Sequence, residues 1–158
     1  MSQKLLFVVN PIAGGNRKDD TMNTIRQWGK SSGHHCDIWE TTGKNDLEQL
    51  KDKILSADPE KVVAVGGDGT LLICAQALLH SGTLLGFIPT GSANGMASEL
   101  QIPDEINDTL RVIEKGNHID ADMICFNGKH YGIHISDIGL NARMVKHFEE
   151  DGTRIDYD

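Results

Sequence analysis

The stretch Val62-Val63-Ala64-Val65-Gly66-Gly67-Asp68-Gly69-Thr70 decides the fold of this chain. It begins with a continuous apolar run, which is typical of a strand buried on both faces of a parallel sheet. The glycines that follow remove the Cβ atoms that would keep an anion away from the main-chain amides. Asp68 places one carboxylate beside these amides, although a turn-forming role is also open to it. The stretch predicts a phosphate-binding turn at the edge of an α/β sheet.

Apolar runs and helical patterns alternate on both sides of this stretch. Strands are predicted at residues 4–9, 37–40, 62–65 and 84–88. Helices are predicted through Met22, Ile25 and Trp28, from a cap at Asp46, and over residues 70–80, 93–100 and 105–115. This order predicts a three-layer, Rossmann-like α/β domain with a parallel sheet, whose ligands gather at the carboxyl ends of the strands.

The pattern changes after Gly116 to strands alone. Residues 119–126 and 129–135 are predicted to form an antiparallel pair around Asn127-Gly128, a strong two-residue hairpin signal. We therefore assign residues 1–117 to the α/β domain and residues 118–158 to the start of a second, β-rich domain. About forty residues are too few for that domain to have a core of its own, so we expect it to be incomplete.

Composition narrows the class of protein. A formal net charge of -8 and few aromatic residues argue against binding to nucleic acid. No apolar run approaches the roughly 20 residues that cross a bilayer, and the start of the chain lacks the pattern of a signal peptide. The three cysteines are widely spaced, which favours neither a disulfide framework nor a zinc site. A cytoplasmic protein is expected.

Three loops rich in glycine or hydroxyl residues follow the first, third and fourth predicted strands. They are Asn10 to Lys18, Gly66 to Thr70, and Pro89 to Gly95. The carboxyl ends of parallel strands lie at one edge of a sheet, so the loops are expected to converge on one anion site. Gly14, Gly15 and Gly91 allow close approach of the backbone. Arg17 or Lys18 can reach phosphate oxygens.

Several catalytic motifs are absent from the sequence. There is no Gly-x-x-x-x-Gly-Lys-Ser/Thr, no Gly-x-Gly-x-x-Gly, and no Gly-x-Ser-x-Gly around Ser92. The seven histidines show no ligand spacing and are expected in the core or at the surface. Asp120 and Asp122 are two apart on a predicted strand and hence on one face. They can hold a hydrated Mg²⁺, or Asp120 can pair locally while Asp122 is solvated.

Taken together, these residues resemble the diacylglycerol kinase catalytic domain family of lipid kinases, in a superfamily with NAD kinases and 6-phosphofructokinases. The resemblance covers nearly the whole chain. It depends on Asn10-Pro11 with Gly14, the Gly66 to Thr70 loop, Pro89-x-Gly91-Ser92-x-Asn94, Ile119-Asp120 and, more loosely, Gly139-x-x-Ala142.

The resemblance implies an ATP-binding α/β domain followed by an antiparallel β-sandwich domain, whose opening strands are the pair predicted after residue 118. It implies transfer of a phosphoryl group to a lipid hydroxyl with Mg²⁺, in phospholipid biosynthesis and lipid metabolism. The implied nucleotide contacts are Asn10, Thr41, Gly67, Gly69, Thr70, Ser92 and Asn94, to which the loops add Gly14, Gly15, Arg17, Gly66, Asp68 and Gly91. Asp68 is implied as the catalytic acid residue, either as a metal-network carboxylate or as the base, and Asp120 is implied as its partner at the metal. The implied acceptor is lipid-like; contact with a membrane surface and a homodimer both stay open.

Three departures from the family keep other functions open. Leu72-Ile73 replaces a polar pair that lipid kinases usually carry, which favours an NAD kinase-like enzyme acting on a small molecule. Asn94-Gly95-Met96-Ala97 lacks a carboxylate common in the third loop and is similar to the sphingosine kinase version. Family members are also about twice as long, so this chain alone is expected to be inactive. A non-catalytic nucleotide-binding or regulatory fragment is the remaining alternative.

Overall fold

The structure is a computed structural model that describes residues 2–12, 18–92 and 94–133. Its main sheet contains β1 (Lys4–Val9), β2 (His35–Glu40), β3 (Lys61–Gly66) and β4 (Leu84–Pro89). All three strand pairings are parallel, and the order across the sheet is β2-β1-β3-β4. The α/β class, the parallel sheet and its Rossmann-like order are therefore confirmed.

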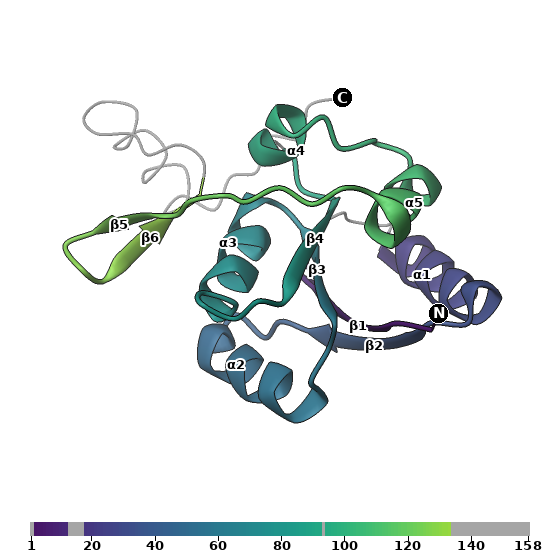
Figure 1. Cartoon of the computed structure of the whole chain (residues 1–158), viewed down its shortest axis with the longest axis horizontal. Coiled ribbons are helices and arrows are strands. Elements are labelled where there is room, and N and C mark those ends of the chain that lie inside the picture. The colour runs from purple at the N-terminus through teal and green to yellow at the C-terminus, as the bar shows by residue number, and fades with distance from the viewer. Residues whose placement is uncertain (1, 13–17, 93, 134–158) are drawn as a thin grey trace.

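Helices cover both faces of this sheet. They are α1 (Lys18–Ser32), α2 (Asp46–Ala57), α3 (Asp68–Ala77), α4 (Gly95–Glu99) and α5 (Ile106–Lys115). Figure 1 shows α1 and α5 on one side of the sheet and α2 and α3 on the other. Helix α3 begins at Asp68, before the residue 70 that the apolar pattern predicts, so the glycine loop runs directly into its first turn.

The central strand β1 contributes to two cores at once. Leu5, Phe7 and Val9 pack with residues of α1 and α5, whereas Leu6 and Val8 pack with residues of α2 and α3. All five are buried. Successive side chains of a strand point to opposite faces, so a strand covered on both faces needs an unbroken apolar run. This is why the pattern of residues 4–9 is continuous rather than alternating.

The four strands end at nearly the same level. Val9 pairs with Glu40 on one side and with Val65 on the other, and Gly66 pairs with Pro89. The chain leaves β1 toward β2 on one edge and later returns to add β3 on the other. A reversal of this kind opens a crevice between the loops that follow β1 and β3, where open α/β sheets bind their ligands.

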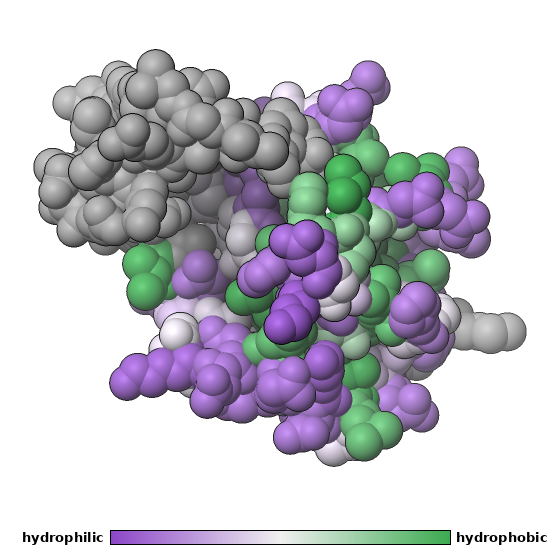
Figure 2. Space-filling model, turned by 90° about the vertical axis from the view of Figure 1, so that its left-hand side faces the viewer, coloured by the Kyte–Doolittle hydropathy of each residue, from purple (hydrophilic) through white to green (hydrophobic). Residues whose placement is uncertain are grey.

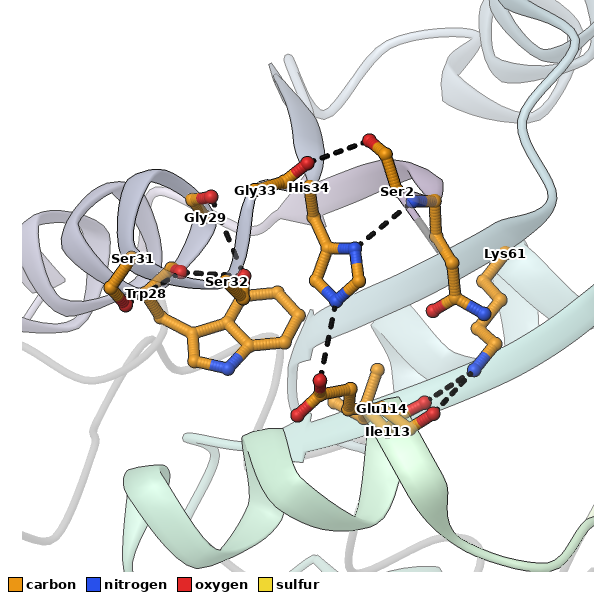
Figure 3. A network of polar contacts seen from close by, with 11 residues as sticks. Ser2, Trp28, Gly29, Ser31, Ser32, Gly33, His34, Lys61, Ile113 and Glu114 are labelled. Carbon is orange, nitrogen blue, oxygen red and sulfur yellow. Dashed lines mark hydrogen bonds and ion pairs between the residues drawn. The ribbon is translucent and has the colours of Figure 1, made fainter.

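A network of polar contacts closes the opposite edge of the sheet (Figure 3). The buried His34 ring accepts a hydrogen bond from Gln3 N at Nδ1, 3.0 Å away, and its Nε2 lies 3.6 Å from a carboxylate oxygen of Glu114. Lys61 Nζ donates to the carbonyl oxygens of Ile113 at 2.6 Å and Glu114 at 3.4 Å. These contacts attach the end of α5 to the start of the strands, far from the edge where the loops meet.

A two-stranded antiparallel sheet follows α5 and projects from the α/β layers in Figure 1. It consists of β5 (Ile124–Phe126) and β6 (His130–Gly132). The predicted turn is confirmed, since Asn127 and Gly128 have φ values of 51° and 66°, the conformation of a type I′ hairpin. The first predicted strand is too long, because residues 119–123 are irregular. Residues 134 and 135 of the second lie outside the described residues.

Several large apolar side chains of the described residues are exposed. Leu55, which is 84% exposed, lies on α2 among charged neighbours, and Val112 is half exposed on α5. The face drawn in Figure 2 mixes hydrophilic and hydrophobic residues accordingly. Among the described helices, none is both long and apolar enough to cross a bilayer.

Candidate functional site

The loops that follow the four strands are joined at one edge of the sheet by main-chain hydrogen bonds. Asn10 N donates to Val65 O at 3.0 Å, which attaches the first loop to the end of β3. Thr41 N donates to Val9 O at 2.9 Å, which attaches the loop after β2 to the end of β1. The predicted convergence of the loops is therefore confirmed for their described residues.

The second and third loops pack most closely. Gly66 O accepts hydrogen bonds from Thr90 N at 2.8 Å and Gly91 N at 3.2 Å. A Cβ on Gly91 would lie 2.6 Å from the Cα of Gly67, closer than real Cβ contacts allow. A Cβ on Gly66 would overlap the Thr70 side chain. Gly91 is thus required by packing between the two loops, and Gly66 by packing against Thr70 within its own loop.

Asn94 fixes the turn of the third loop. Its backbone is left-handed, with a φ of 47°, a conformation that asparagine tolerates better than most residues. Its side chain accepts a hydrogen bond from Gly91 N at 3.0 Å and donates one to Gly91 O at 2.6 Å. The neighbouring Ser92 is exposed.

The Asp68 carboxylate crosses from the second loop to the third. Its Oδ2 accepts a hydrogen bond from Gly95 N at 2.7 Å, and its Oδ1 accepts one from Met96 N at 3.1 Å. These amides open α4, where main-chain N–H groups have no partner within the helix. Each carboxylate oxygen has two lone-pair positions, so half of the accepting capacity of Asp68 is still open to a ligand.

A cavity of about 360 Å³ lies beside α3; we call it the α3-side cavity. Gly67, Gly69 and Thr70 line one end of it. Thr70 N and Leu71 N donate to Gly67 O, whereas the two amides before them, those of Asp68 and Gly69, have no acceptor within a helix. A Cβ on Gly69 would meet no heavy atom within 4 Å, so this side of the turn faces open space. Free amides and the positive end of the helix dipole make this end suitable for an anion such as phosphate.

The other end of the α3-side cavity is formed by the loop between β2 and α2. Thr41, Thr42, Gly43 and Asp46 line it, and Thr41 and Asp46 are buried. The sequence predicts Asp46 as the helix cap, which the structure corrects: Asn45 holds the cap position without a side-chain bond. The Asp46 side chain instead turns back to the loop that precedes it. Asn10 also lines this cavity, at its border with the first loop.

A second cavity, of about 440 Å³, lies on the other face of the sheet beside α1 and α5; we call it the α5-side cavity. Gly91 and Asn94 line this one, and Asn10 borders both. The predicted nucleotide contacts are thus divided. Asn10, Thr41, Gly67, Gly69 and Thr70 surround the α3-side cavity, whereas the third loop faces the α5-side cavity.

Some predicted residues are not brought into this site by the described part of the chain. Gly14, Gly15 and Arg17 lie outside the described residues, as does the loose Gly139-x-x-Ala142 motif. Asp120 is exposed in the irregular segment before β5 rather than on a strand face. Among the described residues, no group of three histidine, cysteine or acidic side chains is placed to hold a metal ion.

The fold and this edge define an α/β protein with glycine-rich loops at the switch point of its parallel sheet. The chain belongs to the diacylglycerol kinase catalytic domain family, whose profile matches residues 4–126. It is similar to proteins named "Probable lipid kinase YegS-like" from Yersinia enterocolitica and Yersinia pestis. It is 28% identical to the first over 144 residues, 89% of this chain and 48% of that protein. It is 28% identical to the second over 149 residues, 92% of this chain and 49% of that protein.

Solved structures agree with this assignment. A diacylglycerol kinase from Bacillus anthracis superposes with a TM-score of 0.66 and 25% identity over 80% of this chain and 44% of the other. The chain therefore spans about half the length of the relatives and the solved structure that it matches.

Proposed function

We propose that this chain is the nucleotide-binding part of an ATP-dependent lipid kinase that transfers a phosphoryl group to a lipid hydroxyl. The observation that carries the proposal is the open first turn of α3, where Gly67 and Gly69 line a cavity beside free amides. Family membership and relatives named as lipid kinases support it. In this proposal residues 1–117 form the nucleotide domain, and residues 118–158 begin a β-rich domain that shapes the acceptor site. The chain acts in the cytoplasm, where a membrane surface presents the lipid.

ATP would lie along the α3-side cavity. Its phosphates meet the amides at the start of α3 and the hydroxyl of Thr70, because these groups donate hydrogen bonds to an anion and Gly67 and Gly69 have no Cβ to keep it away. The remainder of the nucleotide extends toward Asn10 and Thr41, at the ends of β1 and β2. Transfer then depends on positioning and on stabilising the developing charge, as is general for phosphoryl transfer.

Asp68 is the residue we propose at the reacting centre. The bonds from Gly95 and Met96 fix its carboxylate, and its remaining lone pairs can accept the proton of an acceptor hydroxyl or hold a metal-bound water. The donor set fits Mg²⁺, which usually keeps several waters and takes one or two carboxylates plus substrate phosphates. Asp68 would hold it, and when bound it would supply positive charge to the phosphates. The role of Asp120 stays a prediction, because in the described part of the chain Asp120 is exposed before β5.

Phosphoryl transfer from labelled ATP tests this proposal. The chain, extended as far as its gene encodes, is incubated with Mg²⁺ and with either diacylglycerol in micelles or NAD. We expect labelled lipid, and we expect Asp68→Asn to reduce its formation at least about a hundredfold while the Kd for ATP changes little. Asp52→Asn, the same change on an exposed residue of α2, is the control and should leave both unchanged.

Other outcomes would reassign the protein. Labelled NADP without labelled lipid would identify a small-molecule kinase, and ATP binding without transfer to either acceptor would favour a nucleotide-binding or regulatory module. Full turnover by Asp68→Asn would remove Asp68 from the reacting centre.

A further inference from the structure

The turn between β2 and α2 is held by a single buried carboxylate. Asp46 Oδ1 accepts hydrogen bonds from Thr42 N at 2.8 Å and Thr42 Oγ1 at 2.9 Å. Its Oδ2 accepts one from Gly43 N at 2.8 Å. Thr42 Oγ1 in turn accepts a bond from Lys44 N at 3.2 Å. One side chain therefore engages three donors of the turn that walls the α3-side cavity.

Local backbone preference alone does not fix the shape of this turn. Gly43 and Asn45 both have left-handed backbones, with φ values of 79° and 53°, and Asn45 makes no side-chain cap bond to α2. Glycine and asparagine tolerate a left-handed backbone, but both also adopt many other conformations, so a further constraint selects this one. The three bonds to Asp46 are that constraint.

The two ends of the α3-side cavity have opposite electrostatic character. The start of α3 offers amides and the positive end of a helix dipole. At the far end, burial acts to raise the pKa of Asp46, but the bonds from Thr42 and Gly43 outweigh it and hold the pKa below its ordinary value of 3.8. A charged phosphate would be repelled from a carboxylate, whereas an uncharged base and sugar would not. This orientation puts the nucleoside against the Thr42–Gly43 turn.

We propose that Asp46 is a positioning residue for nucleotide selection: it holds the Thr42–Gly43 turn as the wall against which the nucleoside packs. This inference rests on the proposed function, because it takes the ligand of the cavity to be a nucleotide. Asp46 acts through the turn and not through the reacting atoms. Its loss should weaken the contribution of the nucleoside to binding and spare the contribution of the phosphates.

Calorimetric titration of the 158-residue chain with two ligands separates these contributions. ATP carries a nucleoside and three phosphates, and inorganic tripolyphosphate carries the phosphates alone. The variant Asp46→Asn cannot accept the Gly43 N–H with its amide nitrogen, so the turn is left with an unpaired donor. We expect it to raise the Kd for ATP about tenfold while the Kd for tripolyphosphate changes less than about twofold.

Two further variants complete the experiment. Asp58→Asn makes the same change at the exposed end of the same helix and should alter neither Kd. Thr42→Val removes the hydroxyl bonds to Asp46 and Lys44 but keeps the main-chain bonds of Thr42 and Gly43 to Asp46, and it should raise the Kd for ATP by a few fold. Thr42→Val also decides the question if Asp46→Asn does not fold, which melting curves would show.

The possible results of these titrations distinguish failure of the proposed function from failure of the role of Asp46. No binding of ATP by the unsubstituted chain would overturn the proposed function, and this inference with it. If the unsubstituted chain binds ATP and the variants weaken ATP and tripolyphosphate equally, or weaken neither, the proposed function stands and the role of Asp46 is refuted. Selective loss of ATP affinity supports the role, because a general loss of stability would not distinguish the two ligands.

Discussion

Gly91 packs directly against Gly67, so that a Cβ on Gly91 would lie 2.6 Å from the Cα of Gly67 and 3.1 Å from its nitrogen. Both of these Gly67 atoms belong to the main chain and cannot rotate away as the end of a side chain can. The second and third loops therefore approach each other backbone to backbone. The hydrogen bonds of Thr90 and Gly91 to Gly66 depend on this approach.

Replacing Gly91 by alanine should force the two loops apart. We expect Gly91→Ala to lower the free energy of unfolding by about 1–3 kcal/mol, the usual cost of overpacking. Urea titration followed by circular dichroism measures the change. Gly82→Ala is the control, because a Cβ there would meet no heavy atom within 4 Å, and its effect should stay within about 0.5 kcal/mol. Equal stability of the two variants would mean that the loops do not need their close contact.

Lys61 should stabilise the end of α5 more than an ordinary surface lysine stabilises its helix. Its ammonium group donates to the last carbonyls of α5, where the helix dipole is negative (Figure 3). We expect Lys61→Met, which keeps the apolar stem, to cost about 1–2 kcal/mol of unfolding free energy.

Lys51 provides the comparison for this prediction. It pairs with Glu48 at 2.9 Å on the exposed face of α2. Exposed pairs of this kind contribute little, so Lys51→Met should change the unfolding free energy by less than about 0.5 kcal/mol. The two variants are measured by the same urea titration, and similar losses in both would contradict the role given to the carbonyls of α5.

Cys74 should be chemically inert in the folded chain. Its side chain is completely buried, and burial raises its pKa from 9.0 to about 12, whereas the thiolate is the reactive form. Cys125 is exposed on the hairpin. Brief labelling with a maleimide at pH 8, followed by peptide mass spectrometry, should modify Cys125 first and Cys74 only after urea is added. Modification of Cys74 at the rate of Cys125 would contradict the packing of α3 against the sheet.

The same thiol should make stability fall at alkaline pH. Because the folded state raises its pKa, the contribution of Cys74 is complete below pH 9 and is lost as the pH rises from 9 toward 12, where the unfolded chain releases a proton that the folded chain retains. The full slope for one group is about 1.4 kcal/mol per pH unit. The variant Cys74→Ala lacks the titrating group, so the stability difference between it and the unsubstituted chain should change across this range and stay constant below pH 8.

The strands could be predicted from the sequence because each is a short apolar run bounded by turn residues. The edge at which the loops meet could also be predicted, because the carboxyl ends of parallel strands lie at the same edge of a sheet. The Asn127-Gly128 turn could also be predicted from the sequence, since both residue types tolerate the positive φ that this turn requires. The strand predicted around Asp120 failed because Ile119 and its neighbours have no partner strand in the described part of the chain, and a strand needs one.

The bonding of the two buried or half-buried aspartates could not be predicted. The partners of Asp68 are amides of Gly95 and Met96, which come within reach only after β3 and β4 pair and the glycines pack. Asp46 is a residue type that often caps helices. In the structure the left-handed Asn45 takes the cap position, and the Asp46 carboxylate turns back to Thr42. Both sets of hydrogen bonds depend on the path of the main chain between elements, which residue type alone does not specify.

The position of β1 at the interior of the sheet affects how the chain can be made. Its partner on one edge, β2, follows soon in the sequence. Its partner on the other edge is β3, which begins only at Lys61, the residue that pairs with Leu5. At roughly 5–20 residues per second, a ribosome needs several seconds to deliver β3. During that time the apolar β1 has one unpaired edge, which is the feature of a nascent chain that recruits other strands or chaperones. The strand that contributes to both cores is thus synthesised before its two partners and cannot be fully paired until the strand that leads into the glycine loop has been made.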